Sequence, residues 1–123
     1  MAAPQTPTLV GSVEAAATLC FAQVVANGNS GAAETVNWNS GAKQKTTLTA
    51  NCTFTFTAPP GVANLVLFLT QDGTGSRTAT WPATVKWAGA AAPVLSTAAG
   101  ATDIVSFIWD GTNYWGVASL NFA

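Results

Sequence analysis

The chain has 123 residues, 49% of them apolar, a formal net charge of −1 and only 7% charged side chains. This composition excludes a disordered tail, and four Lys and Arg residues are too few to grip the phosphate backbone of DNA or RNA. A typical domain is about 25% charged, so the scarcity of charge favours a subunit whose surface is partly covered by other protein.

The N-terminal segment, residues 1–26, differs from the rest of the chain. Its start, Met1–Pro7, carries no Lys or Arg and so lacks the charged beginning of a secretory signal; we expect the protein to be made and kept in a cytoplasm. Residues 13–26 fit a helix through their alanines or a strand through Thr18–Val25, and we favour an extended arm plus one strand. The run Asn-Gly-Asn-Ser-Gly at 27–31 then predicts a turn.

After residue 34 the apolar residues recur with period two, which indicates strands. Thr46–Thr57 predicts one strand, which Pro59 and Pro60 end. Asn64–Gln71 is apolar on both faces, so we expect one face in the core and the other against the arm or a neighbouring subunit. The longest apolar run, 62–69, is far shorter than the roughly 20 residues of a membrane-spanning helix.

The C-terminal third predicts further short strands at 78–81 and 84–87, then a hairpin. Asp110-Gly111 lies between two strand-prone aromatic runs, 103–109 and 114–120, and is a strong hairpin signal. The sequence therefore predicts an all-β fold: a single antiparallel β-sandwich or barrel-like domain over residues 27–123, with an extended N-terminal arm over residues 1–26.

The stretch T-Q-D-G-T-G-S-R-T-A-T-W-P, residues 70–82, concentrates glycine and charge. A phosphate-binding loop needs a helix after its glycines, whose N-terminal N–H groups face the anion, but here a strand follows. We interpret the stretch as a hairpin turn in which glycines take the positive φ angles and Asp72 pairs with Arg77 on the surface.

The sequence does not predict an enzyme, a metal site or a cofactor. The chain has no histidine to act as a base or ligand. Of its carboxylates, Asp72 and Asp110 lie in turns that explain them, and the others show no pairing. We interpret Cys20 and Cys52 as reduced thiols, with Cys52 buried on one face beside Phe54 and Phe56.

Five tryptophans and one tyrosine form the remaining constellation. Aromatic rings on the face of a sandwich can stack on sugars, with Asn and Asp binding the hydroxyls. We favour the alternative that the tryptophans pack in the core and between subunits, because a small sandwich needs their bulk. Tyr114 lies on the opposite parity to Trp115 and is our candidate for an exposed aromatic that contacts a ligand.

Four separated stretches occur in order: N-G-N-S-G-A-A-E-T-V-N-W, K-Q-K-T-T-L-T-A-N-C-T-F-T-F-T-A-P, L-T-Q-D-G-T-G-S-R-T-A-T-W-P-A-T-V-K-W and D-G-T-N-Y-W-G-V-A-S-L-N-F-A. Over residues 27–123 the chain resembles a small β-structured module of tailed-bacteriophage virion proteins, found at the C-terminal end of tail fibres and in minor structural and decoration proteins. The resemblance implies a self-associating virion component without catalytic residues.

Because no fibre shaft precedes the module here, we expect an exterior capsid decoration (cement) protein, assembled in the host cytoplasm and bound to the virion as a homotrimer. The major capsid protein is the expected partner, with neither nucleic acid nor membrane bound. The apolar arm residues Leu9, Val10 and Val13 are the candidates for gripping that partner. The alternative is a tail-fibre or spike module that binds a receptor or glycan.

Overall fold

The computed structural model describes residues 23–123, which form nine strands, one turn of 3-10 helix and no α-helix. The strands are β1 (Val25–Asn29), β2 (Ala33–Asn37), β3 (Lys43–Leu48), β4 (Cys52–Thr57), β5 (Ala63–Gln71), β6 (Ala79–Thr80), β7 (Val85–Trp87), β8 (Thr102–Trp109) and β9 (Tyr114–Phe122), with the 3-10 turn at Ala88–Ala90.

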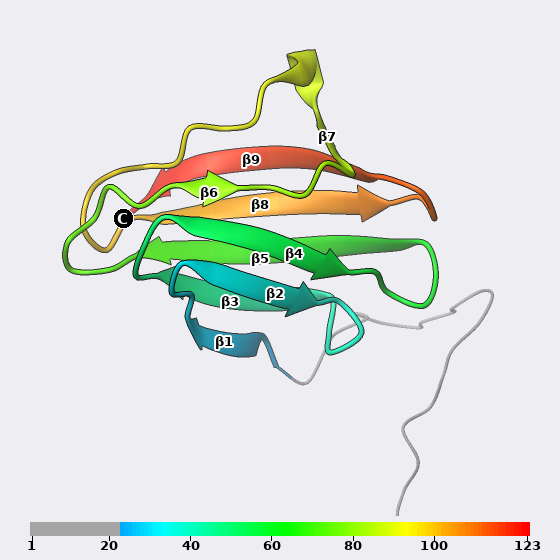
Figure 1. Ribbon diagram of the computed structural model, residues 1–123, viewed down its shortest axis with the longest axis horizontal. Helices are drawn as coiled ribbons and strands as arrows, with labels where there is room; N and C mark the ends of the chain where they lie inside the picture. Colours follow the sequence, from blue (N-terminus) through cyan, green and yellow to red (C-terminus); the bar gives the residue numbers. More distant parts are fainter. Residues whose placement is uncertain (1–22) are drawn as a thin grey trace, which may run out of the picture.

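The strands form two sheets that pack face to face. Six strands make the larger sheet in the order β1-β3-β5-β8-β9-β7, and three make the smaller one in the order β2-β4-β6. Figure 1 shows the smaller sheet lying over the middle of the larger one. The predicted all-β sandwich is therefore confirmed.

From β1 to β6 the chain winds as a coil in which each strand lies in the opposite sheet to the strand before it (Figure 1). As a result β1, β3 and β5 pair in parallel in one sheet, and β2, β4 and β6 pair in parallel in the other. Val25 pairs with Gln44, which pairs in turn with Leu67, so one winding takes about 20 residues, a common length for a structural repeat.

The predicted antiparallel pairing is correct for only part of the sandwich. Among the described residues only β5–β8 and β8–β9 pair antiparallel, and β7 joins β9 in parallel. The expectation failed because a period of two looks the same in parallel and antiparallel ladders. The period of two also does not reveal whether the connection after a strand returns the chain to the same sheet or leads it into the opposite sheet.

The predicted strand Thr46–Thr57 is two strands, β3 and β4, in different sheets. Leu48 and Cys52 are both buried and both have even numbers, so the alternation continues across the corner between them without a break. Asn51 secures this corner, since its Oδ1 accepts a hydrogen bond from Thr78 N at 3.0 Å.

The predicted turn at residues 27–31 begins too early. β1 continues to Asn29 through an irregularity in its pairing between Ala26 and Asn29. Gly28 lies inside it with φ of 75°, the left-handed conformation that glycine adopts without steric cost. The strand expected over Thr18–Val25 lies outside the described residues except for residues 23–25, and β1 begins only at Val25.

The core lies between the two sheets. On β5, Leu65, Leu67 and Leu69 are almost completely buried, whereas Val66 and Phe68 are half-buried on the outer face of the larger sheet. Both faces of β5 are therefore apolar in the structure, the inner face buried in the core and the outer face half-buried. The other strongly buried apolar side chains are Val36, Trp38, Leu48, Cys52, Phe54, Val85, Leu95, Val105, Phe107 and Tyr114.

The β8–β9 hairpin forms as predicted around Asp110-Gly111. Asp110 N donates to Asn113 O at 3.1 Å, and Asp110 Oδ1 accepts from Thr112 N and Asn113 N at 2.8 and 2.7 Å. Gly111 has φ of 98°, which explains why glycine occupies this position.

Candidate functional site

The glycine-rich loop after β5 is a turn closed by an ion pair, as predicted. Arg77 Nη2 lies 3.0 Å from Asp72 Oδ2, and Asp72 Oδ1 accepts from Thr74 N and Gly75 N at 3.1 and 2.9 Å. The Arg77 hydrogen bond, followed by the Gly75 N–H, lowers the pKa of Asp72. Both charges are thus engaged within the turn, and the loop passes the chain from one sheet to the other and is not a hairpin.

A buried glutamine that the sequence reasoning missed anchors this loop. Gln71 is 3% exposed. Its Oε1 accepts from Arg77 N at 2.9 Å, and its Nε2 donates to the carbonyls of Arg77 and Ser96, both at 2.9 Å. The signal available in the sequence was a glutamine at a core-facing position of an otherwise apolar strand.

Asp103 and Glu34, the carboxylates outside the turns in residues 23–123, have structural roles. Asp103 is buried and accepts from Ser96 N and Ser96 Oγ, both at 2.7 Å, and from Asn121 N at 2.8 Å. Glu34 accepts from Thr46 Oγ1 at 2.8 Å, and burial raises its pKa although this hydrogen bond opposes the shift. No group of three His, Cys, Asp or Glu side chains in residues 23–123 is placed to hold a metal ion.

Cys52 is buried, as expected from its face of β4, and burial raises the pKa of its thiol. A protonated, enclosed thiol is a poor nucleophile. Cys20 and the arm candidates Leu9, Val10 and Val13 lie outside the described residues. Within the described part of the chain no helix is long and apolar enough to cross a membrane.

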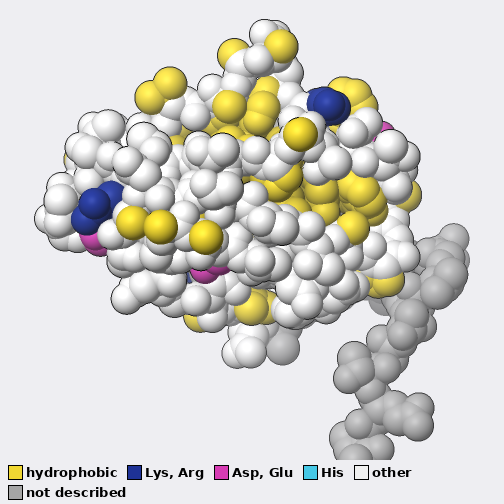
Figure 2. Space-filling view, viewed as in Figure 1, with side chains coloured by type: hydrophobic (Ala, Val, Ile, Leu, Met, Phe, Trp, Pro, Cys, Tyr) yellow, Lys and Arg dark blue, Asp and Glu magenta, His cyan; other side chains and the backbone are white. Residues whose placement is uncertain are grey.

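Aromatic rings fill the space between the sheets. Phe56 and Phe107 are at the centre, with ring centroids 5.3 Å apart, and each contacts Trp38, Trp81 and Tyr114. On the face seen in Figure 2 charged side chains occupy only a few small spots, while apolar side chains appear in several groups, the broadest of them right of the middle. The expectation that tryptophans pack in the core is confirmed for Trp38, which is buried.

Of the neighbouring pair Tyr114 and Trp115, the exposed residue is Trp115, so the expected exposure of Tyr114 is wrong. Tyr114 is 2% exposed and Trp115 is 49% exposed. The sequence correctly placed Tyr114 and Trp115 on opposite faces of the strand, but the pairing of β9 with β8 decides which face lies against the core. Tyr114 lies opposite Trp109 and packs with its ring centroid 4.4 Å away, whereas Trp115 lies opposite the exposed Ile108.

Trp115 is held in place by the hairpin turn. Its Nε1 donates to Asp110 Oδ2 at 2.8 Å, while Asp110 Oδ1 accepts the two N–H groups of the turn. The Asn113 N–H, followed by the Trp115 indole, lowers the pKa of Asp110, so its carboxylate is ionised at neutral pH. The result is an exposed aromatic ring fixed beside a negative charge.

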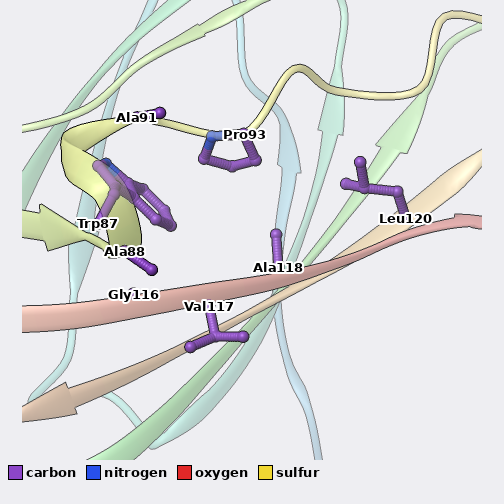
Figure 3. Close-up of a pocket in the computed structure, with 8 residues that line it drawn as sticks. All are labelled: Trp87, Ala88, Ala91, Pro93, Gly116, Val117, Ala118 and Leu120. Atoms are coloured by element: carbon purple, nitrogen blue, oxygen red, sulfur yellow. The ribbon is translucent and has the colours of Figure 1, made fainter.

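A second feature is the open edge of β9. β7 pairs with β9 only at residues 114–116, so among the described residues Val117–Phe122 has a neighbouring strand, β8, on one side alone. A hollow of about 240 Å³ lies along this edge. Figure 3 shows Trp87 and Pro93 on one side of it, with Ala118 and Leu120 pointing into it from β9.

A family model described as "Putative phage tail fibre C-terminal domain" matches residues 33–114, which run from the start of β2 to the start of β9 and include the loop at 72–77 and the hairpin turn. No curated protein and no solved structure matches the chain.

Proposed function

We propose, from the premise that the chain belongs to the phage tail fibre C-terminal domain family, that it is a self-associating module of a bacteriophage tail fibre. The membership itself makes the protein a structural component of a phage virion. Capsid decoration, which we expected from the sequence, stays a prediction. The family description favours the fibre, and this match is the observation that carries the proposal.

The open edge of β9 supports self-association. An unpaired strand edge exposes N–H and C=O groups that can pair with another chain, and proteins usually protect such edges with charge or proline. Val117–Phe122 reads V-A-S-L-N-F and has neither. Val117, Leu120 and Phe122 are 66%, 43% and 47% exposed. A second copy that adds a strand here would cover both the polar backbone and these side chains.

The order of the oligomer follows from which surfaces meet. A trimer requires a heterologous contact, in which two different surfaces join around a threefold axis. The larger sheet has β1 at one end and β9 with β7 at the other. A contact between the β1 edge of one copy and the β9 edge of the next would be heterologous and would give the expected trimer when it closes after three copies, whereas pairing of β9 with β9 would give a twofold dimer.

Sedimentation velocity tests the self-association. We expect the wild-type chain to sediment as an oligomer at micromolar concentration, and Leu120→Lys to shift it to the monomer because a charge at the edge opposes strand addition. Val62→Lys is the matched control, since Val62 is 74% exposed but lies outside the edge. A wild-type monomer, or an oligomer that Leu120→Lys leaves intact, contradicts the proposal.

Copy number per virion separates the fibre from the capsid. A tail fibre contributes a small number of copies, whereas a decoration protein covers the shell in hundreds, and quantitative mass spectrometry of purified particles reads the difference. A chain lacking residues 1–12 adds a direct test of decoration. If the arm residues Leu9 and Val10 grip the major capsid protein, this chain still folds but binds emptied particles much more weakly.

A further inference from the structure

Trp115 differs from the other tryptophans of the chain in being half exposed at a fixed orientation. Trp38 is buried, and Trp81, Trp87 and Trp109 are partly buried and pack against the core. Trp115 lies on the outer face of the larger sheet, and its one polar atom, Nε1, is already bonded to Asp110. The ring therefore presents an apolar surface without an unmet hydrogen-bond donor.

The residues beside Trp115 on the same face are mixed, since Lys86 and Asn64 are polar whereas Ile108 and Val117 are exposed apolar side chains. Across the sheet, the register places Lys86 on one side of Trp115 and Ile108 on the other, with Asn64 beyond Ile108. All three are exposed. Lys86 Nζ donates to Ala83 O at 3.2 Å, which leaves further donor capacity on the ammonium group. Neighbouring strands are about 4.8 Å apart, so donors and acceptors lie within two strands of the ring.

This combination of groups distinguishes between possible occupants. A second copy packed over Trp115 would remove water from the Asp110 carboxylate and the Lys86 ammonium, and burying charges without new partners is costly. A ligand rich in hydroxyl groups can replace that water with hydrogen bonds while an apolar face covers the indole. A sugar ring has both properties, because its C–H bonds gather on one face and its hydroxyls project from the rim.

We propose that Trp115, with Asp110, Lys86 and Asn64 around it, is a binding platform for one hexopyranose ring of a polysaccharide. The ring stacks on the indole. The free lone pairs of Asp110 Oδ2 accept from a hydroxyl of this ring and Lys86 donates to another, while the Asn64 amide, two strands from Trp115, binds the next sugar of the polysaccharide. The Asp110 hydrogen bond holds the indole in position before the sugar arrives, which lowers the entropy lost on binding. The platform adjoins the open edge of β9, since Val117 of that edge lies two residues beyond Trp115 on the same face, but it uses no residue of Val117–Phe122.

Saturation-transfer NMR tests the platform with methyl β-D-galactopyranoside and methyl β-D-glucopyranoside as probes. We expect transfer to the ring protons of at least one glycoside, and none to mannitol, which has the hydroxyls of a hexose but no ring. Trp115→Ala should abolish the transfer, and Val94→Ala, at an exposed apolar site beside Arg77 and Ala79, should leave it unchanged. Trp115→Tyr keeps an aromatic ring and should retain part of the signal.

Asp110→Asn tests the hydrogen bond from Trp115 Nε1 to Asp110 Oδ2, which holds the indole in position. The asparagine Oδ1 still accepts the turn N–H groups, but its amide nitrogen cannot accept from the indole, so we expect the glycoside to bind several-fold more weakly with the fold intact. Equal transfer in Trp115→Ala, equal transfer to mannitol, or no transfer to either glycoside overturns the proposal. If the wild type binds neither glycoside and Trp115→Ala has a lower sedimentation coefficient than the wild type, the surface is a contact between copies. This result also overturns the proposal.

Discussion

Trp87 lies directly against the backbone of Gly116, so closely that a Cβ at residue 116 would be 2.5 Å from the edge of the Trp87 ring. Trp87 is fixed there by its contacts with Trp81 and Phe107, at centroid distances of 5.5 and 5.9 Å. We expect Gly116→Ala to lower the free energy of unfolding by about 1–3 kcal/mol, the usual cost of overpacking, as measured by urea denaturation.

Gly61→Ala is the matched control for this substitution, because nothing lies within 4 Å of a Cβ at residue 61 and its φ is not positive. We expect its effect to be within about 0.5 kcal/mol. Combining Gly116→Ala with Trp87→Leu should recover part of the loss, since the obstructing ring is gone. Equal effects of the two single alanine substitutions would show that the Trp87 contact does not constrain β9.

Gly75 and Gly31 form a second matched pair, since both have positive φ, 74° and 60°. A Cβ at residue 75 would be 2.4 Å from Thr97 O, whereas nothing lies within 4 Å of one at residue 31. Gly31→Ala should cost about 1–2 kcal/mol from the left-handed conformation alone. Gly75→Ala should cost at least about 1–3 kcal/mol more because the neighbouring backbone must shift. Thermal unfolding measures both, and similar costs would contradict this geometry.

Tyr114→Phe should be neutral or stabilising. The Tyr114 hydroxyl is buried and has no hydrogen-bond partner among the described residues, and burial raises its pKa. A buried polar group without a partner costs about 1–3 kcal/mol, and the substitution removes that group but keeps the ring. Tyr114→Ala, which removes the ring as well, should cost about 3–5 kcal/mol. A clear loss of stability in Tyr114→Phe would show that the hydroxyl is satisfied.

Glu34 predicts how stability depends on pH. Burial raises its pKa above the ordinary 4.5, so the folded protein holds the proton more tightly than the unfolded chain. The stability from this group is therefore complete below pH 4.5 and is lost as the pH rises through the higher folded-state pKa. Glu34→Gln, which can still accept from Thr46 Oγ1, should remove this loss.

Unfolding free energies at several pH values above 4.5 test the prediction. The difference between Glu34→Gln and the wild type should grow in favour of the variant as the pH rises. Asp72 and Asp110 act oppositely, since their lowered pKa values give stability that is lost only as the pH falls below the ordinary 3.8. Their contribution is constant over the window used for Glu34. Parallel pH profiles for the variant and the wild type would contradict the assignment.

The sequence predicted what depends on local chemistry. Alternation identified β5 and its two apolar faces, Asp110-Gly111 identified the hairpin, and Asp72 with Arg77 identified the turn. Each of these features is decided by residues within about ten positions of one another, where propensity and side-chain period act directly.

Features decided by distant pairing were missed. Whether Tyr114 or Trp115 faces the core depends on the register with β8, and a shift of one residue exchanges the two faces. The break between β3 and β4 was not visible in the alternation of the sequence, because the buried residues Leu48 and Cys52 both have even numbers. The hydrogen bond between Trp115 and Asp110 had a signal in the sequence, an aspartate five residues before an aromatic residue on the opposite side of a hairpin turn. This signal can be interpreted only when the register of β8 and β9 is known.

The coil from β1 to β6 has a consequence for how such a module changes in length. Each winding supplies one strand to each sheet, so inserting a whole winding of about 20 residues lengthens both sheets and leaves the inward and outward positions of every other strand as they were. Inserting a single residue within a strand would instead exchange its two faces. Size variation among relatives of this chain should therefore come in steps of one winding, with intermediate lengths confined to the corners, where residues such as those at 30–32 and 58–62 connect the sheets.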